Sequence, residues 1–407
     1  MFEHQRPRPW ASLEIPDYRL LWGSVLFSNF ANQSRQFVSI WLVFELTGSP
    51  LQLGLMGLFQ ALPLLAIGLF AGAVVDGKDR RTVLILTQIS NLLLTLILGA
   101  LAIGGMIQTW HIYVITMLGS SANAFSFPAR TAMISNLVPG NYLMNGLALL
   151  SAGQQAVMII SPLIAGLIVG SLGAGLGYLI HLGFFFPAIL LLGLMRRGSG
   201  SSQSRQRVSL ASLVDGVRFV WVTKILLAII ILDTTVMVFG FYRPLLPIFA
   251  KEIFEVGPVG LGALMAAPEV GAALATVLLL VLGNVERKGL IVLYVTGLYA
   301  FATILFGISP VLLLALLLGG VLGFADSLGL TPRTTMVQVL SPDHMRGRAN
   351  SIFSLSAGVA NNLGFLVMGT IAEFIGPRLA MIVGGSIGLV SVLLCSVGWK
   401  SLRQFRG

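Results

Sequence analysis

Apolar runs of about twenty residues recur along almost the whole chain, and short polar turns separate them. An α-helix of that length crosses the hydrocarbon core of a bilayer, because each helical residue adds about 1.5 Å. Hydrophobic residues make up 56% of the chain and charged residues 10%, whereas soluble domains carry about 25% charged residues. The sequence shows none of the alternating segments of about ten residues that are typical of membrane barrels. It therefore predicts an all-α integral membrane protein.

The limits of the apolar runs predict twelve transmembrane helices in two sets of six. Charged residues, proline or glycine bound each run. The first set is 20–46, 51–75, 82–104, 111–133, 143–170 and 174–195, and the second is 225–249, 258–282, 289–308, 311–335, 348–371 and 378–399. A short helix along the membrane interface is expected over 209–221.

One long polar segment, residues 196–213, lies between the two sets of spans. It is rich in serine and arginine, so it cannot bury enough apolar surface to offset the entropy of ordering. We expect a flexible cytoplasmic linker here. The predicted domains are an N-terminal six-helix bundle over 1–195 and a C-terminal six-helix bundle over 214–407.

The two halves also repeat each other in sequence. Arg130-Thr-Ala-Met recurs as Arg333-Thr-Thr-Met at an offset of 203, and at an offset of 208 Arg35 aligns with Arg243. Parallel repeats of this kind characterise secondary transporters whose halves rock about a site between them. The pattern therefore predicts two pseudo-symmetric bundles that work by alternating access.

Basic residues are distributed unevenly between the two sides of this predicted topology. With both termini in the cytoplasm, 21 of the 25 Lys and Arg residues lie at the inner side, and only Arg35, Arg243, Lys251 and Arg378 do not. The positive-inside rule supports that orientation. The net charge of +10 is thus a signal of topology, and no nucleic-acid partner is expected. The single cysteine, Cys395, excludes an intramolecular disulfide.

The turn between the second and third predicted spans reads GAVVDGKDRR over 72–81. It resembles the signature loop of the major facilitator superfamily, and the six-plus-six layout agrees over essentially the whole chain. The segments Thr47-Gly-Ser-Pro50, Pro128-Ala-Arg130 and Arg346-Gly-Arg348 are similar to the bacterial branch that contains enterobactin and macrolide exporters. The resemblance implies export of drugs or siderophores across the bacterial inner membrane.

By the same resemblance, Gly72, Asp76, Arg80 and Arg81 form a gating latch at this turn. Asp76 is expected to cap a helix N-terminus, and the two arginines to pair with it or with anionic lipid headgroups. The alternative is a plain positive-inside turn. The turn departs from the family pattern at two positions, which implies a weaker latch.

The features that mark proton-coupled antiporters of this superfamily are only partly present. The signature of the fifth span is reduced to Gly153, Ser161-Pro162 and Ala165-Gly166. The arginine that such antiporters often carry in the middle of the fourth span is absent, since residues 113–127 hold no charge. If protons drive transport, another titratable group must carry them.

Five ionisable side chains are predicted at membrane depth, where they are costly and normally face protein or water. At about 1.5 Å per residue, Glu269 lies near the midplane, Asp233 and Asp326 lie nearer the cytoplasm, and Arg35 and Arg243 lie in the outer half. We expect Glu269 to carry the coupling proton and Asp326 or Asp233 to relay it inward. The alternatives are structural ion pairs for the carboxylates and snorkelling anchors for the arginines.

Polar side chains in the predicted spans are candidates for a substrate pathway. Each can hydrogen-bond a ligand from an apolar helix, and the alternative is that each holds neighbouring helices together. Together with Arg35 and Arg243, the set is Asn29, Asn32, Gln36, Asn123, Gln155, Asn361 and Asn362.

We therefore predict a monomeric secondary transporter that exports an amphipathic small molecule in exchange for protons or another coupling ion, without a metal or other cofactor. Uptake or lipid flipping by the same fold stays open, as does a membrane sensor that transports nothing. No enzyme is expected. The one nucleophile motif, Gly384-Gly-Ser386-Ile-Gly388, lies inside an apolar span with no strand before it.

Overall fold

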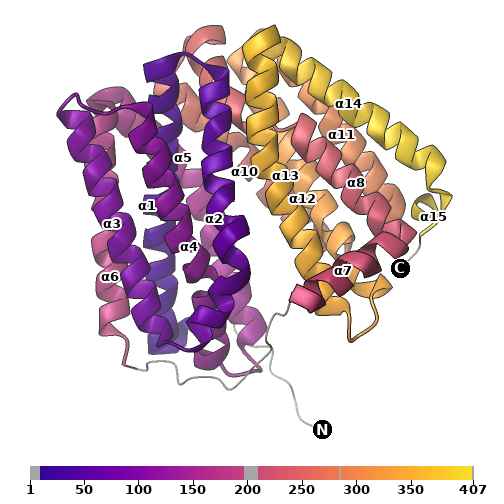
Figure 1. The fold of residues 1–407 in the computed structure, drawn as a ribbon, viewed down its shortest axis with the longest axis horizontal. Helices are drawn as coiled ribbons and strands as arrows, with labels where there is room; N and C mark the ends of the chain where they lie inside the picture. The colour runs from indigo at the N-terminus through magenta and orange to yellow at the C-terminus, as the bar shows by residue number, and fades with distance from the viewer. Residues whose placement is uncertain (1–9, 197–209, 284–285, 406–407) are drawn as a thin grey trace. The chain divides into compact units, whose positions relative to one another are not determined.

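The computed structural model describes residues 10–196, 210–283 and 286–405 (Figure 1). Within these ranges every regular element is helical, and no strand is present. The all-α class predicted from the sequence is therefore confirmed for this part of the chain. Most of the predicted linker, residues 197–209, lies outside the described residues. Helix α7 (Leu210–Val222) begins inside the last four residues of the predicted linker. It matches the short helix expected over 209–221.

The chain divides into two compact units. The first comprises residues 1–39 and 62–207, and the second comprises residues 40–61 and 208–407. The end of the first long helix and the start of the next therefore belong to the second unit. The division into bundles over 1–195 and 214–407 stays a prediction.

The helices of the first unit follow the limits of the apolar runs. They are η1 (Ala11–Glu14), α1 (Pro16–Thr47), α2 (Pro50–Asp76), α3 (Arg80–Ile103), α4 (Thr109–Leu137), α5 (Leu143–Leu182) and α6 (Phe185–Leu194). The turn expected between 143–170 and 174–195 falls inside α5, which joins two helices across a kink. Its backbone is interrupted at Gly173, where φ is 80°, a conformation that glycine adopts without a Cβ clash.

Buried hydrogen bonds attach α1 to the later helices of this unit. The Tyr18 hydroxyl donates to the Gly146 carbonyl at 2.6 Å, and the Ser24 hydroxyl donates to the Ala188 carbonyl at 2.7 Å. Around them Leu21, Met133 and other apolar side chains form the core. Since water is absent from such a core, each polar group needs its partner inside the protein.

The second unit contains the remaining helices. They are α7, α8 (Lys224–Phe239), η2 (Arg243–Leu245), α9 (Leu246–Ile248), the π-helical η3 (Phe249–Ile253), α10 (Gly257–Leu282), α11 (Lys288–Ile308), α12 (Leu312–Leu340), α13 (Arg346–Ile375), α14 (Pro377–Gly398) and α15 (Lys400–Arg403). The sequence predicts one span over 225–249, but α8 ends at Phe239. Pro244 and Pro247 supply no backbone N–H, so the chain continues in short helical segments instead of one regular helix.

Nine candidate membrane spans are found among the described residues. Two long helices, α1 and α4, are not among the nine because polar side chains lower their hydropathy. One of the nine, Leu143–Leu194, is counted as a single span although it holds 52 residues and includes the break at Gly173. Several passes through a membrane are thus supported, and the total of twelve stays a prediction.

Within the second unit, α13 caps the start of α2. Glu373 Oε2 accepts hydrogen bonds from the Ser49 hydroxyl at 2.7 Å and from the Leu51 N–H at 3.0 Å. The first N–H groups of a helix have no partner within it, and a carboxylate satisfies them and complements the helix dipole. The backbones approach closely beside this cap, since a Cβ on Gly369 would lie 2.6 Å from the Pro50 carbonyl oxygen.

Candidate functional site

A polar cavity of about 340 Å³ lies in the first unit, and α1, α4 and α5 form its walls. Its polar lining is Asn29, Asn32, Gln33, Asn123, Ser126, Arg130 and Gln154, and its apolar lining is Phe127, Val157 and Met158. Each helix contributes positions i, i+3 and i+4, which lie on one face, and α4 adds i+7. The sequence therefore directs one face of each helix toward the same space, with most of the polar groups on α1 and α4.

Arg130 is the charged residue in this lining, and its side chain is half-buried. Its guanidinium carbon lies 5.8 Å from the centre of the Phe127 ring, one turn earlier on α4. In the part of the chain that the structure describes, no carboxylate forms an ion pair with it. In the sequence, Arg130 stands out only through the positive-inside pattern and the repeat, so its place in the cavity was not predicted.

Arg35 lies beside this cavity and is 9% exposed. Its Nη2 donates to Asn32 Oδ1 at 3.1 Å and to Asn91 Oδ1 at 3.0 Å, while Nη1 has no hydrogen-bond partner among the described residues. Gly119 leaves the space that the guanidinium fills, since a Cβ there would lie 2.7 Å from Nη2. The side chain thus points into the unit and is held by amide oxygens.

Asn91 on α3 links Arg35 to the cavity wall. Its Nδ2 donates to the Thr87 carbonyl at 3.0 Å and to Asn123 Oδ1 at 3.2 Å, and Asn123 lines the cavity. One turn away, the Ser126 hydroxyl donates to the Thr87 hydroxyl at 2.8 Å. Sequence reasoning missed Asn91. The available signal was the spacing of Thr87, Asn91 and Thr95, which places three buried polar groups on one face of an apolar helix.

In the second unit, Arg243 and Glu269 form an ion pair with 2.5 Å between Nη2 and Oε1. Glu269 lies on α10 and its side chain is 8% exposed, whereas Arg243 begins the segment η2 and is 32% exposed. The irregular backbone after α8 carries Arg243 to this position. The two predicted side chains are therefore brought together, and a pair buried in this way leaves little net charge.

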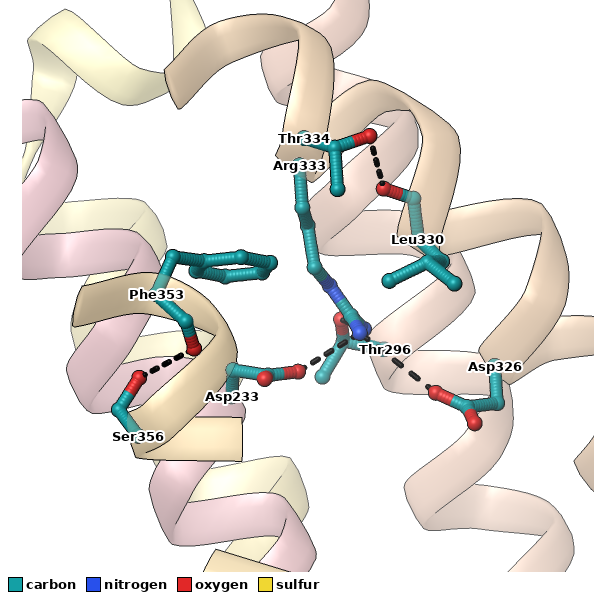
Figure 2. A network of polar contacts seen from close by, with 8 residues as sticks. All are labelled: Asp233, Thr296, Asp326, Leu330, Arg333, Thr334, Phe353 and Ser356. Carbon is teal, nitrogen blue, oxygen red and sulfur yellow. Dashed lines mark hydrogen bonds and ion pairs between the residues drawn. The ribbon is translucent and has the colours of Figure 1, made fainter. Parts of the chain in front are cut away.

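A second cluster in this unit surrounds Arg333 on α12. Figure 2 shows the guanidinium between Asp233 of α8 and Asp326 of α12. Its Nη1 lies 2.6 Å from Asp233 Oδ1 and 3.5 Å from Asp326 Oδ1. Arg333 also donates to the Thr296 hydroxyl of α11 at 3.2 Å. The Asp233 side chain is 8% exposed and that of Asp326 is 51% exposed. The predicted relay carboxylates thus share one arginine, which the sequence analysis had assigned to the inner interface.

At the predicted gating turn, Asp79 and not Asp76 caps the start of α3, and a cap by Asp76 on another helix stays a prediction. Helix α2 ends at Asp76, and Asp79, whose backbone is extended, stands immediately before the first residue of α3. Asp79 Oδ2 accepts from the Thr82 N–H at 3.1 Å and from the Thr82 hydroxyl at 2.7 Å. The side chain of Asp76 and residue Gly72 lie outside the part whose environment the structure describes.

The cap also affects the acidity of Asp79. Burial acts to raise its pKa, but the hydrogen bonds from Thr82 and from the Arg81 N–H outweigh that effect and hold the pKa below its ordinary value. The predicted latch arginines bind carbonyl groups: Arg80 Nη1 donates to Ala132 at 3.0 Å, and Arg81 Nε donates to Leu192 at 2.8 Å. These contacts fasten the turn to α4 and α6.

The other predicted pathway residues do not line the cavity. Asn362 Nδ2 donates to the Gly358 carbonyl in its own helix at 2.8 Å, and Asn361 is exposed. On α5 it is Gln154, and not its neighbour Gln155, that lines the cavity. Gln36 is half-buried on α1 outside the lining. Their part in a pathway stays a prediction.

Comparisons with known proteins give a consistent result. A family model described as transmembrane secretion effector matches residues 7–404. The chain is 26% identical over 372 residues to the multidrug efflux pump Tap of Mycolicibacterium fortuitum. The matched region covers 87% of this chain and 90% of that protein. It is also 26% identical over 344 residues to the enterobactin exporter EntS of Salmonella paratyphi A. That matched region covers 84% of this chain and 82% of the exporter.

A solved structure has a similar fold. It is a bacterial homolog to the human lysosomal transporter Spinster in an inward-facing and unoccupied conformation. The TM-score is 0.74 at 15% identity, over 96% of this chain and 98% of the other. At this identity the likeness concerns the fold alone.

Proposed function

Because the chain belongs to the transmembrane secretion effector family of the major facilitator superfamily, it is a membrane transporter and not an enzyme, and we propose that it exports amphipathic small molecules by alternating access. The observation that carries this proposal is the cavity in the first unit, which combines amide groups and one arginine with an apolar wall. Export is supported by the likeness to proteins named as an efflux pump and an exporter.

We assign substrate binding to the cavity-lining amides. Asn29, Asn32 and Asn123 present donors and acceptors that orient a ligand, while Phe127 and Met158 contact its apolar part. A volume of about 340 Å³ is within the range of about 300–1,000 Å³ that is usual for small-molecule sites. Arg35 and Asn91 hold one wall in place from behind.

We assign coupling to the carboxylates of the second unit. A proton on Glu269 would neutralise it and release Arg243, so a proton and the arginine compete for one carboxylate. Asp326, whose side chain is half exposed, is the accessible member of the inner cluster, and Asp233 is the buried member that fixes Arg333. In this scheme Asp326 passes the proton on and Asp233 positions its partner. The competing role is simple neutralisation of the two arginines.

The proposed membrane orientation follows the basic residues. With 21 of 25 Lys and Arg residues on one side, both termini and the 196–213 linker are placed in the cytoplasm, and the membrane is proposed to be the bacterial inner membrane. An export substrate then enters from the cytoplasmic side. A monomer is sufficient for this scheme.

Everted membrane vesicles from an efflux-deficient bacterial host test the direction of transport. Respiration acidifies the vesicle interior, so an exporter that exchanges protons accumulates a fluorescent amphiphile inside. We expect accumulation that exceeds that of vesicles lacking the protein and that collapses when nigericin removes the pH gradient. Accumulation only in right-side-out vesicles would reverse the assigned direction and favour uptake.

A further inference from the structure

The arginines of the membrane helices differ in what satisfies their charge. Arg243 is paired with Glu269, and Arg333 is paired with Asp233 and Asp326. Arg130 has the face of a phenyl ring beside it, and no ion pair with a carboxylate in the described ranges. A ring face contributes only about 0.5–2 kcal/mol to a cation, which is less than a carboxylate contributes in a dry site.

The sequence repeat shows what is missing beside Arg130. At the offset of 203 that relates Arg130 to Arg333, Asn123 corresponds to Asp326. Both pairs are seven residues apart, so each pair lies on one face of its helix. In the second unit that face carries its own anion, 3.5 Å from the arginine. In the first unit the same position carries a neutral amide that faces the cavity.

We propose that the ligand of the cavity carries a carboxylate and that Arg130 is the residue that recognises it. This inference rests on the proposed transport function and names its substrate class: amphipathic organic carboxylates of small size. The planar guanidinium matches a carboxylate with two parallel hydrogen bonds. Phe127 and Met158 contact the apolar part of the ligand, and Asn123 hydrogen-bonds without competing for the arginine.

A matched pair of dyes tests this recognition without a need for transport. Dansylglycine carries a carboxylate, and dansylglycinamide carries a neutral amide on the same aromatic body. Binding to the purified full chain in lipid nanodiscs is measured by dansyl fluorescence and competition. We expect dansylglycine to bind at least about tenfold more tightly, the advantage of a charge-assisted pair, and to lose that advantage in Arg130→Gln.

Two further variants keep the test decisive. Arg19→Gln removes an exposed arginine of the same unit outside the cavity lining and should leave the preference intact. Asn123→Asp places at the repeat position the carboxylate that the second unit has, and should also abolish the preference, even if Arg130→Gln does not fold. Equal affinity for the two dyes, saturable binding of neither dye, or an unchanged preference in both cavity variants would overturn the inference.

The failure of the inference and the failure of the proposed function give different results. Preferential dansylglycine binding that depends on Arg130, in a protein that moves no dye in everted vesicles, supports the carboxylate site and contradicts export. Transport of neutral amphiphiles by a protein that binds both dyes equally contradicts the carboxylate site and supports export.

Discussion

The two units differ in what contacts four of their arginines, which are Arg35 and Arg130 in the first unit and Arg243 and Arg333 in the second. In the first unit, Arg35 is bonded to amide oxygens and Arg130 lies beside a phenyl ring. In the second unit, Arg243 and Arg333 are bonded to carboxylates, with Glu269 in one cluster and two aspartates in the other. Among the described residues, the charges of Arg35 and Arg130 therefore stay without a carboxylate, whereas those of Arg243 and Arg333 are neutralised. The two copies of the sequence repeat thus differ in the groups that contact their arginines.

This difference fits a ligand-binding role for the first unit and a coupling role for the second. A binding site for an anionic ligand must leave its arginine unpaired until the ligand arrives, so an amide at position 123 suits the first unit. A coupling site must hold titratable carboxylates in a defined place, and an arginine provides that place. Substitutions in each unit therefore test the two arrangements separately.

The largest effect is expected for Arg333→Ala in the second unit. The substitution leaves Asp233, which is 8% exposed, without its ion-pair partner. Breaking a buried pair from one side typically costs about 3–5 kcal/mol, because the remaining charge stays buried. The free energy of unfolding in mixed detergent micelles should fall by that amount.

Two controls accompany this substitution. Arg346→Ala removes one member of an exposed pair with Asp343 and should change the free energy of unfolding by about 0–1 kcal/mol. Adding Asp233→Asn to Arg333→Ala should restore part of the lost stability, since the uncompensated charge is then gone. Equal losses for the buried and the exposed pair would contradict the account of the second unit.

A smaller loss is expected for Asn91→Leu in the first unit. This substitution removes the hydrogen bond from Arg35 and the bond to Asn123, and a bond to a charged group contributes about 1.5–3 kcal/mol. The free energy of unfolding should fall by about 2–3 kcal/mol. Thr95→Val, one turn further along the same buried face, loses only a bond to its own helix and should cost less than about 1 kcal/mol. Similar values for both variants would mean that Asn91 does not anchor Arg35.

Next in size is the effect of Glu269→Gln on coupling. The amide has nearly the same shape but cannot carry the proton, so gradient-driven accumulation in proteoliposomes should fall by about tenfold or more, equivalent to about 1.4 kcal/mol. Exchange of substrate without a gradient should persist. Glu252→Gln, which changes an exposed acid of the same unit, is the control. A variant that folds poorly but remains coupled would assign Glu269 to neutralising Arg243.

Sequence patterns predicted the long regular helices well. The span expected over 258–282 is α10 (Gly257–Leu282), and that over 289–308 is α11 (Lys288–Ile308), because glycine or charge bounds each apolar run. The patterns failed where backbone geometry decides the structure. The span expected over 225–249 stops early, at Phe239, because Pro244 and Pro247 interrupt the regular helix, whereas the break expected between 170 and 174 is found at Gly173.

The candidate site was predicted in part. Asn29, Asn32 and Asn123 were singled out as polar groups in apolar helices, and the structure places all three at one cavity. Arg130 was missed because an arginine near the end of a span satisfies the positive-inside rule equally well. The pairing of Arg333 with Asp233 and Asp326 was missed for a related reason. It joins α8 to α12, and sequence spacing does not say which helices are neighbours.

The smallest effect concerns the starts of α3 and α11, which also differ between the units. At an offset of 208, Asp79 corresponds to Arg287. Asp79 caps α3 through Thr82, whereas Arg287 makes no side-chain cap on α11. Asp79→Ala should lower the free energy of unfolding by about 1 kcal/mol, the usual value of a lost cap. Arg287→Ala should have little effect, and an equal loss would remove this difference between the units.

The pH dependence of this cap separates its charge from its hydrogen bonds. Since the pKa of Asp79 in the folded protein lies below its ordinary value of 3.8, the ionised carboxylate contributes stability that is complete above that value. The contribution is lost as the pH falls through the lower, folded-state pKa. Asparagine accepts the same hydrogen bonds but does not titrate there, so Asp79→Asn should be nearly as stable as the parent protein at neutral pH. Unfolding followed from pH 6 down to about pH 3 should show the parent losing stability relative to Asp79→Asn only below about pH 4. A constant difference between the two proteins over this range would mean that the carboxylate charge adds nothing to the cap.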